Sequence, residues 1–295
     1  MTMDQSRMQR ALVLAGGGVS GVAWEIGVLT ALDRAGIDIA NADLIVGTSA
    51  GSVVGTLVAG ETPFDKAFAS QLVPAEQSSE RNVDFDPTQF QQMILSLWQQ
   101  FGQDARAIRA GIGKQAQAAR TISAEERRAI IASRLPFPEW PHRNLLINAV
   151  DAESGEWVVF NSGSGVNLVD AVAASCAVPL IWPVVTINGR SYMDGGMRSG
   201  TNADLARGYN KVLVLNPLLG MDNLPPVLGS NLNVEKALLE KEGSQVMVIG
   251  ASEAAVKAMG LNVLDPANRA NSANAGLEQG QSLVEAVRGF WSSES

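Results

Sequence analysis

The sequence predicts an α/β protein in which a central, mostly parallel sheet carries helices on both faces. Residues 11–14 and 44–46 are short apolar runs, as expected for buried strands. Each run is followed by a glycine-containing turn and then by a segment of helical composition, at residues 22–32 and from residue 50 to about 59. Strand, glycine turn and helix, repeated in succession, are typical of a parallel α/β sheet. A three-layer architecture follows, because each helix must cover one face of the sheet.

Later segments add elements of the same kind. Residues 167–175 are expected to form a helix that Asn167 caps, and residues 267–290 a polar C-terminal helix. Asn188-Gly189 lies between two short β-prone runs and is a strong hairpin signal. Further strands are expected at residues 145–150, 157–160, 184–187, 190–193, 211–215 and 246–249.

Residues 63–135 differ from the rest because they are rich in Gln, Ala and Arg and poor in strand formers. We expect a single domain over residues 1–295 in which this segment is a cap-like insertion of two or three helices. Apolar side chains recur at helical spacing along one face of it: Phe90, Met93, Ile94, Leu97, Trp98 and Phe101. Two interpretations stay open, a helix packed on the sheet or a mobile cap whose apolar face meets lipid.

Charge and composition restrict the partners. A net charge of −8 argues against a nucleic-acid partner, since such proteins need a basic face to replace phosphate counterions. The same charge disfavours simple electrostatic docking on anionic lipid. No cluster of metal-ligating residues stands out, and no cofactor is expected.

The single cysteine, Cys176, excludes an intramolecular disulfide and fits a reducing compartment. Its place at a buried helix end predicts an inert core thiol. No uncharged stretch approaches the ~18–20 residues that a transmembrane helix needs. We therefore expect a cytoplasmic protein, with transient contact at a membrane surface left open.

Gly47-Thr48-Ser49-Ala50-Gly51 matches the pattern G-x-S-x-G and lies between a predicted strand and a small-residue helix. A serine at such a sharp turn takes a strained backbone conformation that exposes its Oγ above the sheet. The flanking glycines, Gly47 and Gly51, avoid clashes where the strand and the helix come closest. The pattern therefore predicts that Ser49 is a nucleophile.

The glycine-rich segment 15–21 has two interpretations. Gly16, Gly18 and Gly21 fit the G-x-G-x-x-G spacing of a dinucleotide-binding turn. That turn requires an acidic residue at the end of the second strand, whereas Asp43 precedes that strand here. In a hydrolase the exposed N–H groups of such a loop would instead form an oxyanion hole.

The general base is less obvious. The one histidine, His142, should lie at the N-terminal edge of its strand, opposite Ser49. A carboxylate is then the candidate for the general base that activates Ser49. Asp194, which ends a strand and precedes Gly195-Gly196, is the first choice, and Asp151 the second. Two further aspartates lie in helix-like surroundings: Asp170 and Asp204.

Taken together, Gly16-Gly17-Gly18, the turn at Ser49 and Asp194-Gly195-Gly196 resemble the patatin-like phospholipases. Residues 174–179, followed by Trp182-Pro183, are similar to the segment that precedes that family's aspartate. The resemblance runs from about residue 10 to about residue 216 and weakens across 63–135.

This resemblance implies a three-layer patatin-like fold and a Ser-Asp dyad without histidine. Ser49 would be the nucleophile, Asp194 the general base, and Gly16, Gly17 and Gly18 would line the oxyanion hole and bind substrate. It also implies lipid or acyl-ester substrates. One departure is Ser20, which stands where the family often carries Lys or Arg.

Three alternatives to a lipid acyl hydrolase remain. A dinucleotide-dependent oxidoreductase would use the loop at Gly16, and a non-catalytic lipid-binding protein would retain only the fold. Acyl transfer from a carrier thioester resembles the hydrolase chemically, but it usually needs a histidine.

Overall fold

The computed structural model describes residues 8–83, 87–220 and 226–292. Its centre is an eight-stranded sheet with the order β5-β6-β3-β2-β1-β7-β8, and β4 pairs with β3 outside this path. Five strands are parallel, and β4, β5 and β6 are antiparallel to their partners. The strands are β1 (Arg10–Leu14), β2 (Leu44–Gly47), β3 (Leu145–Asp151), β4 (Trp157–Phe160), β5 (Val185–Ile187), β6 (Arg190–Asp194), β7 (Lys211–Asn216) and β8 (Gln245–Gly250).

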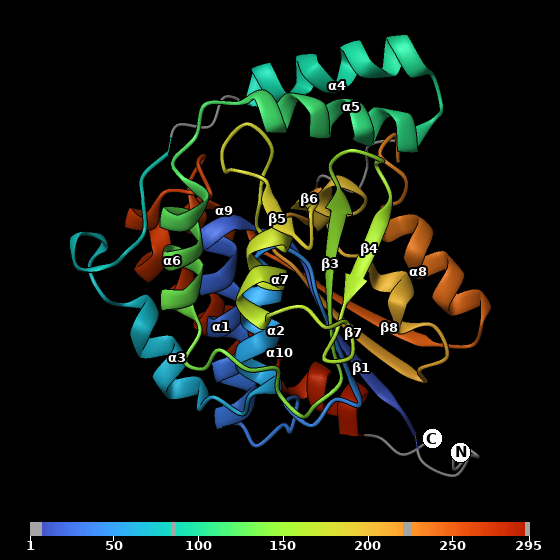
Figure 1. Cartoon of the computed structure of the whole chain (residues 1–295). Helices are drawn as coiled ribbons and strands as arrows, with labels where there is room; N and C mark the ends of the chain where they lie inside the picture. The colour runs from blue at the N-terminus through green and yellow to red at the C-terminus, as the bar shows by residue number, and fades with distance from the viewer. Residues whose placement is uncertain (1–7, 84–86, 221–225, 293–295) are drawn as a thin grey trace.

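Helices cover both faces of this sheet, which confirms the predicted three-layer α/β class (Figure 1). The thicker layer contains α1, α2, α7 and α10, and the thinner layer contains α8 with a short 3-10 turn, η3 (Ala203–Ala206). The helices are α1 (Gly18–Arg34), α2 (Ala50–Ala59), α3 (Phe64–Gln71), α4 (Pro87–Phe101), α5 (Ala105–Ala118), α6 (Ala124–Arg134), α7 (Leu168–Ser175), α8 (Leu232–Lys241), α9 (Glu253–Met259) and α10 (Arg269–Ser292).

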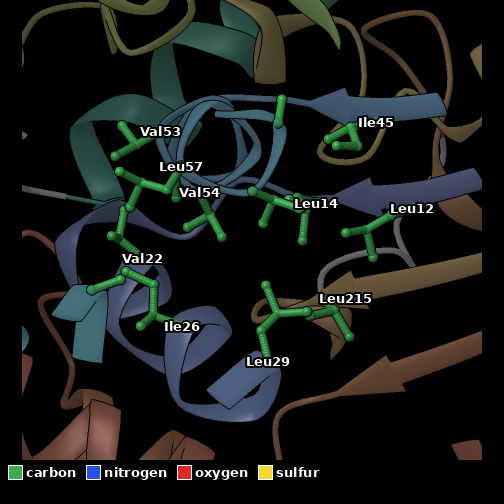
Figure 2. Packing of buried hydrophobic residues seen from close by; sticks show 14 of the residues in the cluster. Leu12, Leu14, Val22, Ile26, Leu29, Ile45, Val53, Val54, Leu57 and Leu215 are labelled. Carbon is green, nitrogen blue, oxygen red and sulfur yellow. The ribbon is translucent and has the colours of Figure 1, made fainter. Parts of the chain in front are cut away.

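Alternation along the central strands divides the core in two. Leu12, Leu14 and Ile45 point to the thicker layer, where they pack against α1 and α2 (Figure 2). Val13 and Val46 point to the opposite face and join the cluster under α8. Successive side chains of a strand point to opposite faces, so a strand covered on both faces is apolar throughout.

The C-terminal helix is more than the polar helix that the sequence predicts. α10 lies along α1, and glycines stand where the two backbones approach each other. A Cβ added to Gly27 would lie 2.7 Å from the Leu277 nitrogen, and one added to Gly280 would lie 2.8 Å from the Val28 carbonyl oxygen. The far end of α10 is anchored by the buried Trp291.

The segment 63–135 is helical, as predicted, but its described residues form four helices, α3 to α6, rather than two or three, and these helices have different positions. α3 and α6 lie against the main body, whereas α4 and α5 form a hairpin that projects above the sheet (Figure 1). The hairpin has its own small core, made by Met93, Leu97, Ile108 and Ile112 with Val150, Ala152, Met193 and Met197 from the ends of β3 and β6. Contacts with β3 and β6 come from α5, so α4 forms the outer layer. None of the described helices is both long and apolar enough to cross a membrane.

Candidate active site

Ser49 stands at the turn between β2 and α2, in a conformation that side chains rarely adopt. Its φ is 51° and its ψ is −115°, and it caps the N-terminus of α2. A non-glycine residue in this region stores backbone strain, which persists only when the surroundings enforce it. The strand-to-helix turn that G-x-S-x-G predicts is therefore present, with the serine at its apex.

The glycines of the motif are required by close backbone contacts. A Cβ added to Gly47 would lie 2.6 Å from the Gly51 carbonyl oxygen, and one added to Gly51 would collide with the Leu14 carbonyl. The Gly51 N–H donates to the Ala15 carbonyl at 3.0 Å. The turn is thus held against the end of β1, beside the glycine-rich loop.

Residues from α7 hold the backbone of Ser49 in place. The Ser49 N–H donates to Ser175 Oγ at 2.9 Å, and the Cys176 thiol donates to the Ser49 carbonyl at 3.2 Å. Burial raises the pKa of the Cys176 thiol, as expected for an unreactive core cysteine. The stretch 174–179 therefore supports the turn at Ser49 as well as leading to Asp194.

Asp194 reaches Ser49 because two strands meet end to end on the same side of β3. β2 pairs with the first half of β3 and β6 with the second half, and β4 occupies the other side. Gly47 pairs with Ile147, and Asp194 pairs with Ala149, two residues further along. Since β6 runs antiparallel to β3, its C-terminal end points at the C-terminal end of β2. Asp194 and Ser49, two residues beyond Gly47, are thus at the same level.

The carboxyl of Asp194 is buried, with only 3% of the residue exposed. Its Oδ1 accepts the Gly196 N–H at 2.7 Å, and its Oδ2 has no hydrogen-bond partner at normal length in the described residues. Burial raises the pKa of Asp194 to about 7. The Gly196 N–H, the Ser49 hydroxyl and the Arg127 guanidinium act in the opposite direction. Gly195 is needed here because a Cβ would lie 2.5 Å from the Asn148 carbonyl oxygen.

Arg127 of α6 is a buried cation beside this carboxylate that the sequence did not indicate. Its guanidinium lies 3.8 Å from the centre of the Trp182 ring, and its Nη2 donates to the Cys176 carbonyl at 3.5 Å. Nε and Nη1 have no partner in the described residues. Burial, reinforced by Arg134, lowers the pKa of Arg127 to about 9. In sequence it belongs to a charged run, 125–128, which is typical of a solvated helix face.

The glycine-rich loop lies against the same turn. A Cβ added to Gly16 would be 3.6 Å from the Ser49 Cβ, and the Gly16 N–H donates to the Gly200 carbonyl at 2.9 Å. In the described residues, no hydrogen bond uses the N–H groups of Gly17 and Gly18. Gly18 has a φ of 62°, which favours glycine. The bond to Gly200 means that Gly17 and Gly18, rather than Gly16, are the available donors of the predicted oxyanion hole.

The other candidate residues lie elsewhere. His142 is exposed and precedes β3, so it lies at the sheet edge opposite Ser49. Asp151 is buried, and its Oδ1 accepts the N–H groups of Glu153 and Ser154 in a tight turn. Ion pairs engage the remaining two aspartates: Asp170 with Arg128 and Asp204 with Arg198.

Two asparagines that no sequence motif singles out, Asn148 and Asn202, connect the parts of the site. Asn148 Nδ2 donates to the Gly47 carbonyl and to Thr48 Oγ1, at 3.2 Å each. Asn202 has left-handed backbone angles, and its Nδ2 donates to Thr48 Oγ1 at 3.1 Å. Asn148 does leave a signal, because it interrupts the apolar run 145–150. Asn202 leaves none, since it lies in an irregular loop.

A cavity of about 380 Å³ lies to one side of Ser49 and Asp194, between α1, α2, α3 and α6. Val19 and Val53, neighbours of the glycine-rich loop and of Ser49, line its apolar wall. Neither Ser49 nor Asp194 lines it. In the described residues, no group of three or more His, Cys, Asp or Glu side chains is placed to hold a metal ion.

The parallel sheet, the strained serine turn and the glycine loop beside it define an α/β protein with a strand-serine-helix turn at the C-terminal edge of its sheet. A model of the patatin-like phospholipase family matches residues 12–207, about two thirds of the chain. The chain belongs to this family of lipid hydrolases. No curated protein matched the chain.

Solved structures with a similar chain path include VipD from Legionella pneumophila, with 13% identity and a TM-score of 0.45 over 95% of this chain and 67% of VipD. The type III effector ExoU matches with 13% identity and a TM-score of 0.43, over 95% of this chain and 53% of its own. ExoU in complex with SpcU, from Pseudomonas aeruginosa, matches with 15% identity and a TM-score of 0.36, over 93% of this chain and 53% of that chain. The chain thus spans about two thirds of VipD and about half of ExoU.

Proposed function

We propose that this protein hydrolyses acyl esters of lipids, with Ser49 as nucleophile and Asp194 as general base. The observation that carries the proposal is the end-to-end meeting of β2 and β6, which brings a strained serine level with a buried carboxylate. Membership of the patatin-like phospholipase family supports a lipid substrate.

The first half of the reaction forms an acyl-enzyme. Asp194 accepts the hydroxyl proton of Ser49 while Oγ attacks the ester carbonyl. The N–H groups of Gly17 and Gly18 stabilise the resulting oxyanion. When the intermediate collapses, the alcohol leaves and takes the proton from Asp194.

In the second half, water attacks the ester between Ser49 and the acyl group. Asp194 now accepts a proton from the water, and the same glycine N–H groups stabilise the second oxyanion. Collapse releases the fatty acid and returns the proton to Ser49 Oγ. The bonds and protons balance without a redox partner.

The environment of Asp194 suits this role. An ordinary aspartate is a weak base for a serine hydroxyl, whereas burial raises the pKa of Asp194 to about 7, close to neutral pH. Arg127 limits this rise, because its positive charge favours the ionised carboxylate.

The geometry gives less support to a dinucleotide site. Asp43 precedes β2, and its carboxylate accepts the Arg10 N–H at the start of β1, at 2.8 Å. It therefore lies at the sheet edge opposite the glycine-rich loop. Pro217 also packs against that loop, since its ring would be 2.8 Å from a Cβ on Gly17.

A fluorophosphonate probe tests the proposal directly. The purified protein should be labelled at Ser49 alone, as peptide mass mapping would show, and Ser49→Ala should abolish labelling. The same variant should lose at least about 10⁴-fold in hydrolysis of a soluble ester while keeping its fold.

His142→Ala is the matched control and should keep both labelling and turnover. A hundredfold loss in that variant would instead indicate a histidine-containing triad. Full turnover in folded Ser49→Ala would refute the assignment of the nucleophile.

A further inference from the structure

Large apolar side chains are exposed around the edge of the sheet at which Ser49 and Asp194 lie. Three of them are on α4: Leu95 (52% exposed), Trp98 (44%) and Phe101 (36%). They follow one another at intervals of three residues and so share one side of the helix. The inner side, with Met93 and Leu97, packs on α5 and joins the apolar cluster that α5 forms with the ends of β3 and β6, next to Asp194.

Two exposed leucines flank the glycine-rich loop from another direction. Leu261 is fully exposed, in a loop that packs on the start of α1. In that loop the Val263 carbonyl accepts the Ser20 N–H at 3.0 Å. Leu219 is 39% exposed and follows Pro217, whose ring lies against Gly17. Exposed apolar groups thus surround the site on two sides.

α4 also differs from the other surface helices in charge. Residues 87–101 contain no Asp, Glu, Lys or Arg, and the polar positions are Gln, Ser and Thr. Exposed Val234 and Val256, by contrast, lie on α8 and α9 among charged residues, as isolated surface valines usually do. An exposed helix without charges, bearing Trp and Phe, suits the interfacial region of a bilayer.

We propose that this edge is a membrane-docking surface for zwitterionic lipid, formed by Leu95, Trp98, Phe101, Leu219 and Leu261. These five side chains come from three separate segments, so a deformable lipid surface fits them better than a folded partner with one fixed shape. Docking there would present a lipid ester to the edge that holds Ser49. This inference depends on the proposed hydrolase function in one respect only, which is that the docked lipid is the substrate.

Charge selects the kind of lipid. The chain carries a net charge of −8, so anionic lipid would repel it on average. Two arginines of α5 are already engaged: Arg106 pairs with Glu156 at 3.0 Å, and Arg109 donates to the Gly155 and Leu228 carbonyls. The exposed Lys114 is the remaining cation of α5, so burial of the five apolar side chains, rather than a basic cluster, has to supply most of the binding free energy.

Co-sedimentation with phosphatidylcholine vesicles tests the surface. Wild-type protein should bind, and the triple variant Leu95→Gln, Trp98→Gln, Phe101→Gln should bind at least about a hundredfold more weakly. Leu261→Gln alone should lose about tenfold, the effect of withdrawing one large apolar side chain from lipid. Val234→Gln, an equally exposed position on α8, is the matched control and should bind like the wild type.

Fluorescence gives an independent readout. All six tryptophans lie in the described residues, and only Trp98 is exposed there. Vesicles should shift the emission to shorter wavelength in the wild type. Trp98→Phe should still bind but should lose the shift.

Three outcomes would overturn the proposal. The first is that the wild type does not bind the vesicles. The second is that its binding requires anionic lipid and disappears in high salt. The third is that the triple variant binds the vesicles as well as the wild type does. Loss of a dimer in the triple variant, seen by analytical ultracentrifugation, would also overturn it by making α4 a self-interface.

Turnover of a soluble short-chain ester, measured on the same samples, separates this proposal from the proposed function. It should be unchanged in every docking variant. Ester turnover without vesicle binding would refute only the proposed docking surface. If the protein binds vesicles and the variants behave as expected, but no ester is hydrolysed, only the proposed hydrolase function would be refuted.

Discussion

The strand-turn-helix unit around Ser49 and the α4–α5 hairpin both depend on apolar packing, but they differ in what surrounds the backbone. At the Ser49 turn, glycines face other backbone atoms, and the polar groups of Asn148, Ser175 and Asn202 are hydrogen-bonded. In the hairpin, α5 is held on the body by close backbone contact at Gly113, but α4 packs on α5 through side chains and leaves large apolar groups exposed. Backbone contacts and buried hydrogen bonds leave the Ser49 turn one arrangement, whereas α4 packs on α5 through side chains, which can adjust their rotamers.

The difference matches the two tasks that we propose. Catalysis needs donors and base held within a fraction of an ångström, which a backbone-locked turn provides. Contact with a lipid surface needs exposed apolar area and tolerates adjustment. The following predictions test this contrast, beginning with the largest expected effect.

Asp194→Asn should lower kcat/KM for a soluble ester by about 10³-fold or more, because the amide cannot accept the serine proton. In the wild type, kcat/KM should rise with pH and level off above about pH 7, as the raised pKa of Asp194 implies. Below that value it should fall tenfold per pH unit. A pH–rate profile from pH 5 to 9 checks this, and a profile that is flat below pH 6 would contradict a base with this pKa.

Gly51→Ala should destabilise the protein by about 3 kcal/mol or more, since the new Cβ collides with the Leu14 carbonyl. Gly111→Ala in α5 should change stability by less than about 1 kcal/mol. There the Cβ meets only the end of the Leu97 side chain, at 2.5 Å, and alanine favours the helix. Urea unfolding measures both. Equal destabilisation by the two changes would remove the contrast between a rigid turn and an adaptable hairpin.

Glu25→Gln should stabilise the protein in a pH-dependent manner. Glu25 of α1 is buried, and its carboxyl oxygens have no hydrogen bond of normal geometry in the described residues. Burial raises its pKa well above 4.5, although the nearby backbone of Ala15 acts in the opposite direction. The folded state therefore binds a proton that the unfolded state releases above pH 4.5, so wild-type stability falls as pH rises towards the raised pKa.

The advantage of Gln should grow by up to about 1.4 kcal/mol per pH unit over that window. Urea unfolding of both proteins at pH 5, 6, 7 and 8 gives the difference. A constant difference across this range would show that Glu25 keeps its ordinary pKa.

Much of the fold could be predicted from local patterns. The Asn188-Gly189 hairpin forms as β5 and β6, with positive φ at both residues, because that turn type requires it. The first helix was predicted to begin at Val22 but begins at Gly18, four residues earlier. The difference arises because the glycines at its start are poor helix formers and gave no helical signal. α10 looked polar in sequence, yet its glycine side packs on α1. Composition does not show such close approaches, because a glycine contributes no hydrophobic signal.

The candidate site divides in the same way. The turn at Ser49 was recognisable in the sequence because its serine and glycines are close together in the chain. Steric contacts between these neighbours require those residue types. Which carboxylate faces Ser49 was open between Asp194 and Asp151 on strand ends alone. That choice depends on β6 running antiparallel on the β2 side of β3, a long-range pairing without a local code.

Local patterns in the chain were therefore enough for the class of fold, the strained serine and the glycine loop, because these follow from periodicity and backbone sterics between neighbours. Only the tertiary structure explains why Asp194 rather than Asp151 lies level with Ser49, and only it reveals the buried charge of Arg127 and the outward face of α4. Each of these depends on which distant segment occupies the adjoining space, and therefore on the packing of the whole chain.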